Sequence, residues 1–145
     1  MLKPAAKFAT ARFKFVVALT AALLGSAAPA MARQVEFDQA TIAELSAAMA
    51  SGSLTAEKLM ELCLARIKAF DRDGPKLHAV ITLNPKAMEQ ARAMDAERKA
   101  GKVRGPLHGI PVVLKDNYDT FDMQTTGGSV LLAGNVPPDD AYMVK

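Results

Sequence analysis

Apolar residues recur every three or four positions just after Thr41, which is the spacing of a helix with one buried face. The residues of that face are Ile42, Leu45 and Met49, and we expect them to point inward. Thr41 and Glu44 have the spacing of a capping box, in which each side chain accepts a hydrogen bond from the other residue's amide. The pattern predicts a short helix that ends at Ser51-Gly52.

The same spacing continues over residues 56–71, where Thr55 can cap a second helix. Its apolar positions are Leu59, Leu62, Cys63, Ile67 and Phe70. A third helix is predicted from Pro85 to about Lys99, with Asn84 as its cap and Gly101 as its stop. Three helices are therefore expected before residue 102.

Two further stretches favour strands. "HAVITLN" (78–84) is β-branched and apolar at its centre, and "VVLK" (112–115) is a continuous apolar run that ends in Lys115. A strand without polar residues is typical of burial on both faces. The order of helices and strands predicts an α/β domain in which helices cover a mixed β-sheet. Lys115 would then stand at the carboxyl end of a central strand, where open α/β sheets bind ligands.

The N-terminal residues have a different pattern. Four cations and no acid (Lys3, Lys7, Arg12, Lys14) precede the apolar segment 15–24, and Ala30-Met31-Ala32 has the form of a cleavage site. The apolar segment is about half of the roughly 20 residues that a membrane-spanning helix needs. We expect a secretory signal peptide over residues 1–32, a mature domain over 33–145, and export to the periplasm or the medium without a stable membrane anchor. A short buried helix is the alternative.

Removal of residues 1–32 changes the charge balance. The whole chain has 18 basic and 15 acidic residues, and without the four N-terminal cations 14 basic residues remain. The remaining cations form no basic run, so we expect no nucleic-acid partner.

Cys63, the only cysteine, lies on a helical stripe and is expected to pack in the core. His78 and His108 stand at unrelated positions and predict no metal site, and His108 is expected to be a turn or packing residue.

Two roles are open to Lys115. Its ammonium can mark the point where the strand meets water, with the stem along apolar surface. Alternatively, burial can lower an ordinary lysine pKa of about 10.4 toward the range of roughly 7–8 that suits a general base. Asp116 would oppose the second role by stabilising the charged amine. Successive strand residues point to opposite faces, however, so the two side chains need not meet.

Three strings together carry a resemblance to a known family: "GPLHGIPVVLKDNYDT" (105–120), "TTGGS" (125–129) and "NVPPDDAYMV" (135–144). They resemble the first third of the amidase signature family. The resemblance implies the N-terminal part of the α/β amidase-signature fold and hydrolysis of carboxamide C–N bonds by a Ser, cis-Ser, Lys triad. Lys115 matches the lysine of that triad. It also implies a small-molecule or peptide amide substrate, no cofactor and no metal, and similarity to carbon–nitrogen ligases that use glutamine as amide donor.

The resemblance also assigns the loop that follows. Thr126, Gly127, Gly128 and Ser129 are expected to shape the substrate site, since glycine permits positive φ. In the family the nucleophile and the bridging serine lie downstream of the Pro-Pro-Asp block, and no Gly-Gly-Ser-Ser string occurs in this sequence. Ser129 matches the Thr-Thr block and not the nucleophile.

Residues 139–145 have the pattern of a helix start, with Asp139 or Asp140 as the cap. We therefore expect the N-terminal fragment of an exported amidase, truncated before its nucleophile. The alternatives are a shortened, non-catalytic binding module and a gene fragment without activity.

Overall fold

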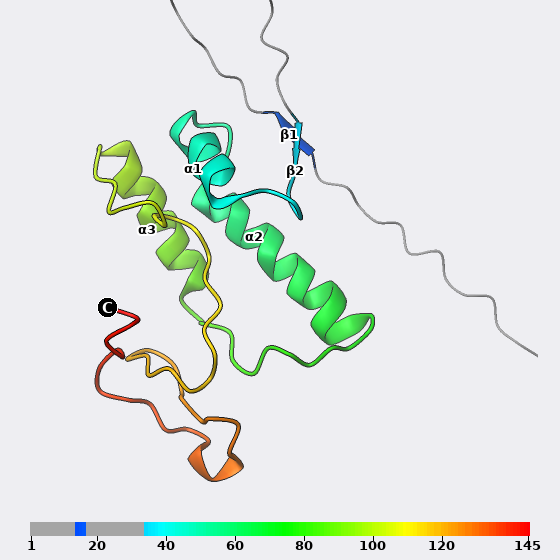
Figure 1. Cartoon of the computed structure of the whole chain (residues 1–145), viewed down its shortest axis with the longest axis vertical. Coiled ribbons are helices and arrows are strands. Elements are labelled where there is room, and N and C mark those ends of the chain that lie inside the picture. The colour runs from blue at the N-terminus through cyan, green and yellow to red at the C-terminus, as the bar shows by residue number, and fades with distance from the viewer. Residues whose placement is uncertain (1–13, 17–33) are drawn as a thin grey trace, which may run out of the picture. The chain divides into compact units, whose positions relative to one another are not determined.

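The computed structural model describes residues 14–16 and 34–145, and Figure 1 shows the whole chain. Apart from residues 14–16, the predicted signal peptide lies outside the described residues. The chain divides into two units, residues 1–54 and 55–145, which are described separately. No helix in the described part of the chain is long and apolar enough to cross a membrane.

The first unit contains a short antiparallel strand pair and one helix. Strand β1 (Lys14–Val16) pairs with β2 (Gln34–Glu36), and helix α1 (Ile42–Ala50) follows. The capping box is confirmed, because the Thr41 amide donates to Glu44 Oε2 (3.0 Å) and the Glu44 amide to Thr41 Oγ1 (3.2 Å). Leu45 and Met49 are buried as predicted, but Ile42 is 50% exposed, which corrects its inward assignment.

The second unit begins with the predicted second helix. Helix α2 (Ala56–Arg66) continues into the π-helix η1 (Ile67–Asp73), so the predicted extent is confirmed and the last turns are wider than expected. The Thr55 hydroxyl caps α2 by accepting from the Lys58 amide (3.0 Å). Leu59 is 1% exposed.

Helix α3 (Ala87–Lys99) begins two residues later than predicted. Asn84 forms a turn before the helix instead of capping it, because its Oδ1 accepts from the Lys86 amide (2.8 Å). Gly101 ends the helix as predicted, with φ of 75° and an amide that donates to the Arg98 carbonyl (3.0 Å).

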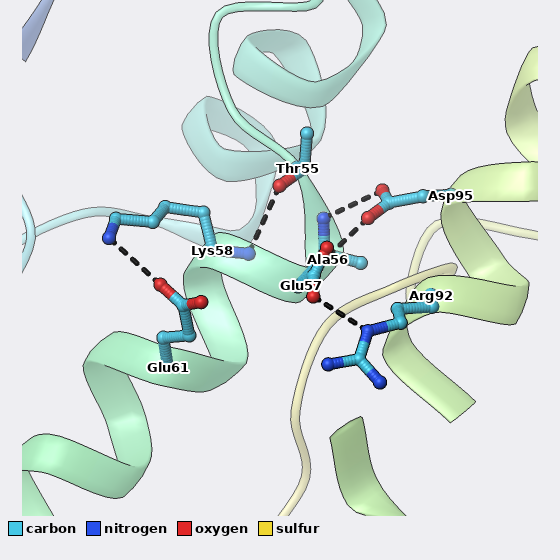
Figure 2. Close-up of polar contacts among 7 residues, drawn as sticks. All are labelled: Thr55, Ala56, Glu57, Lys58, Glu61, Arg92 and Asp95. Atoms are coloured by element: carbon cyan, nitrogen blue, oxygen red, sulfur yellow. Dashed lines mark hydrogen bonds and ion pairs between the residues drawn. The ribbon is translucent and has the colours of Figure 1, made fainter. Parts of the chain in front are cut away.

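One carboxylate joins α2 to α3 (Figure 2). Asp95, in the third turn of α3, accepts from the Ala56 amide at 2.8 Å and from the Glu57 amide at 3.0 Å. These amides belong to the first turn of α2, whose N–H groups have no partner within the helix. The negative charge also lies at the positive end of the α2 dipole. Beside it, Arg92 Nε donates to Glu57 Oε1 at 2.7 Å.

The two predicted strands are not formed, which corrects the prediction of a mixed β-sheet. Residues 78–84 and 112–115 are irregular, and the described residues contain no strand besides β1 and β2. Val112, Val113 and Leu114 are 61%, 87% and 39% exposed instead of buried. The physical reason is that a helix closes its hydrogen bonds within one segment, whereas a strand needs a neighbouring strand to accept and donate.

The predicted helix start at residues 139–145 is also absent, and the chain makes a single turn there. Asp140 does not cap it, because its Oδ1 accepts from the Phe121 amide at 3.0 Å. A short 3₁₀ helix, η2 (Val130–Leu132), precedes this region. From residue 102 onward the described fold therefore consists of turns and this short helix, held by backbone and side-chain hydrogen bonds.

We predict that Asp95→Ala lowers the free energy of unfolding by about 1 kcal/mol or more, because it leaves two helix-start amides without their acceptor. Arg92→Ala is the matched control on the same helix. It removes only an exposed ion pair and should cost about 0.5 kcal/mol or less. Urea unfolding followed by circular dichroism measures both. Equal losses for the two variants would contradict the role of Asp95.

Candidate active site

A broad hollow of about 1660 Å³ lies in the second unit and is lined mostly by apolar side chains. Cys63 of α2 and Met94 of α3 border it, together with much of the segment 104–118. Lys115, Asp116, Gly127 and Gly128 also border it. The structure thus brings the predicted base and two of the four predicted substrate-binding residues to one surface.

Lys115 lies at the end of the irregular apolar segment, and its backbone carbonyl accepts from the Tyr118 amide at 3.0 Å. Its side chain is exposed, so the desolvated amine expected at the end of a buried strand is not present in the described chain. The reason is the same as for the missing β-sheet. Because no neighbouring strand is present, nothing in the described residues covers this segment. Its ammonium forms no ion pair with the described carboxylates.

Asp116 binds the loop that follows and forms no ion pair with Lys115. Its carboxylate accepts from the Thr126 amide (3.2 Å), from the Thr126 hydroxyl, and from the Gly128 amide (3.2 Å). These donors, the Thr126 hydroxyl first, hold the pKa of the Asp116 carboxyl below its usual range. The Asp116 charge is therefore stabilised by the loop.

The predicted substrate-binding residues occupy different positions. Thr126 is 6% exposed and turned toward Asp116, whereas Gly127 and Gly128 are exposed at the hollow. Both glycines have positive φ, 57° and 79°, as expected for this loop. Ser129 is half-buried, and its amide donates to the Thr126 carbonyl (2.9 Å).

The turn before Lys115 is fastened to α3 by His108. This side chain is 5% exposed, its Nε2 lies 2.8 Å from the Met94 carbonyl, and its Nδ1 accepts from the Arg104 amide at 3.3 Å. Nε2 therefore carries the proton and donates. Arg98 donates to the His108 carbonyl at 2.9 Å. The prediction that His108 is a packing residue is confirmed.

The remaining candidates do not form a second site. Burial raises the pKa of the Cys63 thiol, partly opposed by Arg66, which suits a packing residue better than a nucleophile. Within the part of the chain that the structure describes, no group of three or more His, Cys, Asp or Glu side chains could hold a metal ion.

The model of the family described as Amidase matches residues 58–145, more than half of the chain. The chain belongs to the amidase family. This confirms the resemblance carried by the three strings, and the matched residues include Lys115 and the whole Asp116 network.

Known amidases and related proteins match with high identity. A glutamyl-tRNA(Gln) amidotransferase subunit of Streptomyces coelicolor is 45% identical over 72% of this chain and 21% of its own length. A putative amidase of Schizosaccharomyces pombe is 40% identical over 78% of this chain and 19% of its own length. The solved peptide amidase of Stenotrophomonas maltophilia superposes with a TM-score of 0.72 at 48% identity, over 74% of this chain and 22% of that one. The chain thus spans about a fifth of these relatives.

Asp116 is the residue of this amidase surface that sequence reasoning missed. Its position next to Lys115 suggested a competing charge, whereas the structure makes it the acceptor for Thr126 and Gly128. The available signal was an acidic residue ten positions before a Thr-Gly-Gly turn, since successive amides in such a turn favour an anion.

We predict that the Asp116 carboxyl titrates below its ordinary value of 3.8 in the folded protein. A lowered pKa means that its stabilising contribution is present above the ordinary value and is lost as the pH falls through the folded-state midpoint. Carboxyl ¹³C NMR measures the midpoint. Thr126→Val removes the largest cause and should move the midpoint upward, and an unchanged midpoint in that variant would contradict the assignment.

Proposed function

We propose that the chain is the N-terminal part of an exported amidase that hydrolyses carboxamide C–N bonds, with Lys115 as the general base. The observation that carries the proposal is the family match over residues 58–145, which contains Lys115 and its surrounding string. The 48% identity to a peptide amidase supports hydrolysis of an amide as the reaction. Because the chain spans about a fifth of its relatives, the activity is proposed for the complete enzyme.

A lysine serves as general base only as the neutral amine, and removal from water is what favours that form. Lys115 is exposed in the described chain. We therefore infer that a covering part of the enzyme, or the bound substrate, desolvates it. The same covering part would supply neighbouring strands to residues 78–84 and 112–115, which would then join a mixed β-sheet.

The proposed reaction uses two serines that the family resemblance implies and that are not located in this chain. Neutral Lys115 accepts the proton of the nucleophilic serine through the bridging serine, while the serine oxygen bonds to the amide carbonyl carbon. The C–N bond breaks, and the proton on Lys115 passes to the leaving nitrogen. Water then hydrolyses the acyl-serine, so amide and water give a carboxylic acid and an amine or ammonia.

Two substrate classes follow from the relatives. The peptide amidase favours a peptide amide, and a mostly apolar hollow suits such a ligand. The second candidate is glutamyl-tRNA, on which the chain would act as a component of an amidotransferase. This candidate rests on the name of the relative from Streptomyces coelicolor. Ammonia release from a peptide amide in the absence of any other protein would support the first class over the second.

We predict that Lys115→Ala lowers kcat of the enzyme encoded by the complete reading frame by at least about 100-fold, since it removes the general base. Lys99→Ala, an exposed lysine at the end of α3, is the matched control and should retain activity. Ammonia release from a peptide amide is the assay. Full turnover by the Lys115→Ala enzyme would exclude Lys115 as the base.

We also predict that the exported protein begins at Arg33, because cleavage is expected after Ala32. N-terminal sequencing of the protein from the periplasmic fraction or the medium tests this. A protein that is recovered from the cytoplasm with Met1 still present would contradict the proposed export.

A further inference from the structure

Three hydrogen-bond donors of one loop converge on a single carboxylate. Asp116 Oδ1 accepts from the Thr126 amide (3.2 Å), and Oδ2 accepts from the Thr126 hydroxyl and from the Gly128 amide (3.2 Å). The Asp116 carbonyl also accepts from the Gly127 amide at 2.7 Å. Every residue of the segment 126–128 is therefore tied to Asp116.

The loop has the geometry of an anion-binding nest, and the anion is the protein's own side chain. The Thr126 and Gly128 amides donate to the Asp116 carboxylate and the Gly127 amide between them donates to the Asp116 carbonyl. Both glycines have the positive φ that such a turn of donating amides uses. A Cβ at either glycine would meet no atom within 4 Å, so it is the positive φ and not a lack of space that favours glycine here. The hydrogen bonds to Asp116 hold this conformation, together with those from the Gly128 amide to Thr126 Oγ1 (3.1 Å) and from the Ser129 amide to the Thr126 carbonyl (2.9 Å).

Asp116 directly follows Lys115, so the same contacts fix the loop relative to the proposed base. Lys115, Gly127 and Gly128 border one hollow. We propose that Asp116 is a positioning residue of the amidase: its carboxylate fastens residues 126–128 beside Lys115, on the surface that receives the amide substrate. The inference rests on the proposed function for the role of Lys115, but the fastening itself does not.

The contacts have a second consequence for Lys115. A carboxylate one residue away would favour the charged amine if the two groups paired. The donors of Thr126 and Gly128 occupy both Asp116 oxygens instead, and the described chain shows no ion pair between Asp116 and Lys115. The contacts of the Asp116 carboxylate therefore go to the loop and not to the Lys115 ammonium.

Hydrogen exchange in the enzyme encoded by the complete reading frame tests the fastening directly. Asp116→Asn replaces one acceptor oxygen by an amide group that donates, and the Thr126 and Gly128 amides bind different Asp116 oxygens. At least one of the two amides should therefore exchange at least about tenfold faster than in the unaltered enzyme. Asp119→Asn is the matched control, since Asp119 is exposed and its backbone carbonyl, not its carboxylate, accepts from the Ala141 amide. Unchanged exchange at both amides in Asp116→Asn would overturn the inference.

Kinetics test the positioning. With a peptide amide as substrate, Asp116→Asn should raise KM about tenfold and change kcat less than about threefold, because the loosened loop binds substrate and Lys115 remains. An unchanged KM would overturn the inference.

Thr126→Val and Thr126→Ser provide a second pair that does not depend on the folding of Asp116→Asn. The valine should speed exchange at the Gly128 amide, whereas the serine keeps the hydroxyl that contacts Asp116 and Gly128 and should not. Identical exchange in the two variants would overturn the inference.

The two proposals fail separately. Lys115→Ala should leave exchange at Thr126 and Gly128 unchanged while it abolishes turnover. Retained turnover in that variant overturns the role of Lys115 as the base. Unaltered exchange in Asp116→Asn overturns the fastening alone.

Discussion

The contact between Asp95 and the first turn of α2 is the constraint on which the second unit depends. Two amides of α2 donate to one carboxylate of α3, so the helices are joined by a specific geometry as well as by apolar contact. The pairing places a negative charge at the N-terminus of α2, where the first amides would otherwise have only water as a hydrogen-bond acceptor. Because α2 and α3 are the two long helices of this unit, their relative position determines what the later turns can attach to.

The site is attached to α3 at both ends of that helix. Near its carboxyl end, His108 and Arg98 hold the turn that precedes Lys115. Before its amino end, Asn84 donates to Asp122 (3.0 Å), and Gln124 donates to Thr82 (3.0 Å), which holds the loop between Lys115 and Thr126. Asp116 then joins that loop to the lysine segment. The exposed residues of the site are thus placed by contacts with α3 and with the segment that precedes it.

The helices were predictable because their determinants are local. The Thr41 and Glu44 capping box, the Thr55 cap and the Gly101 stop are each decided by residues within four positions. The predicted strands are not formed in the described chain because ladder hydrogen bonds need a second segment, and the apolar pattern of residues 112–114 says nothing about whether one is available. Asp95 and Asp116 act across 39 and 10 residues, so no periodicity revealed them.

Lys115 and Asp116 are adjacent, but the surroundings that each side chain needs extend over different distances along the chain. The carboxylate of Asp116 needs donors, and a loop ten residues away supplies them, so its pKa is lowered within the described chain. A lysine that is to act as a base needs the opposite, the exclusion of water, and this requires a large apolar surface above it. The exposed side chains of Val112 and Val113 supply apolar surface close to Lys115 in the sequence. The hydrogen bonds of Asp116 are therefore local, whereas the desolvation that the proposed role of Lys115 requires is not provided by the described residues.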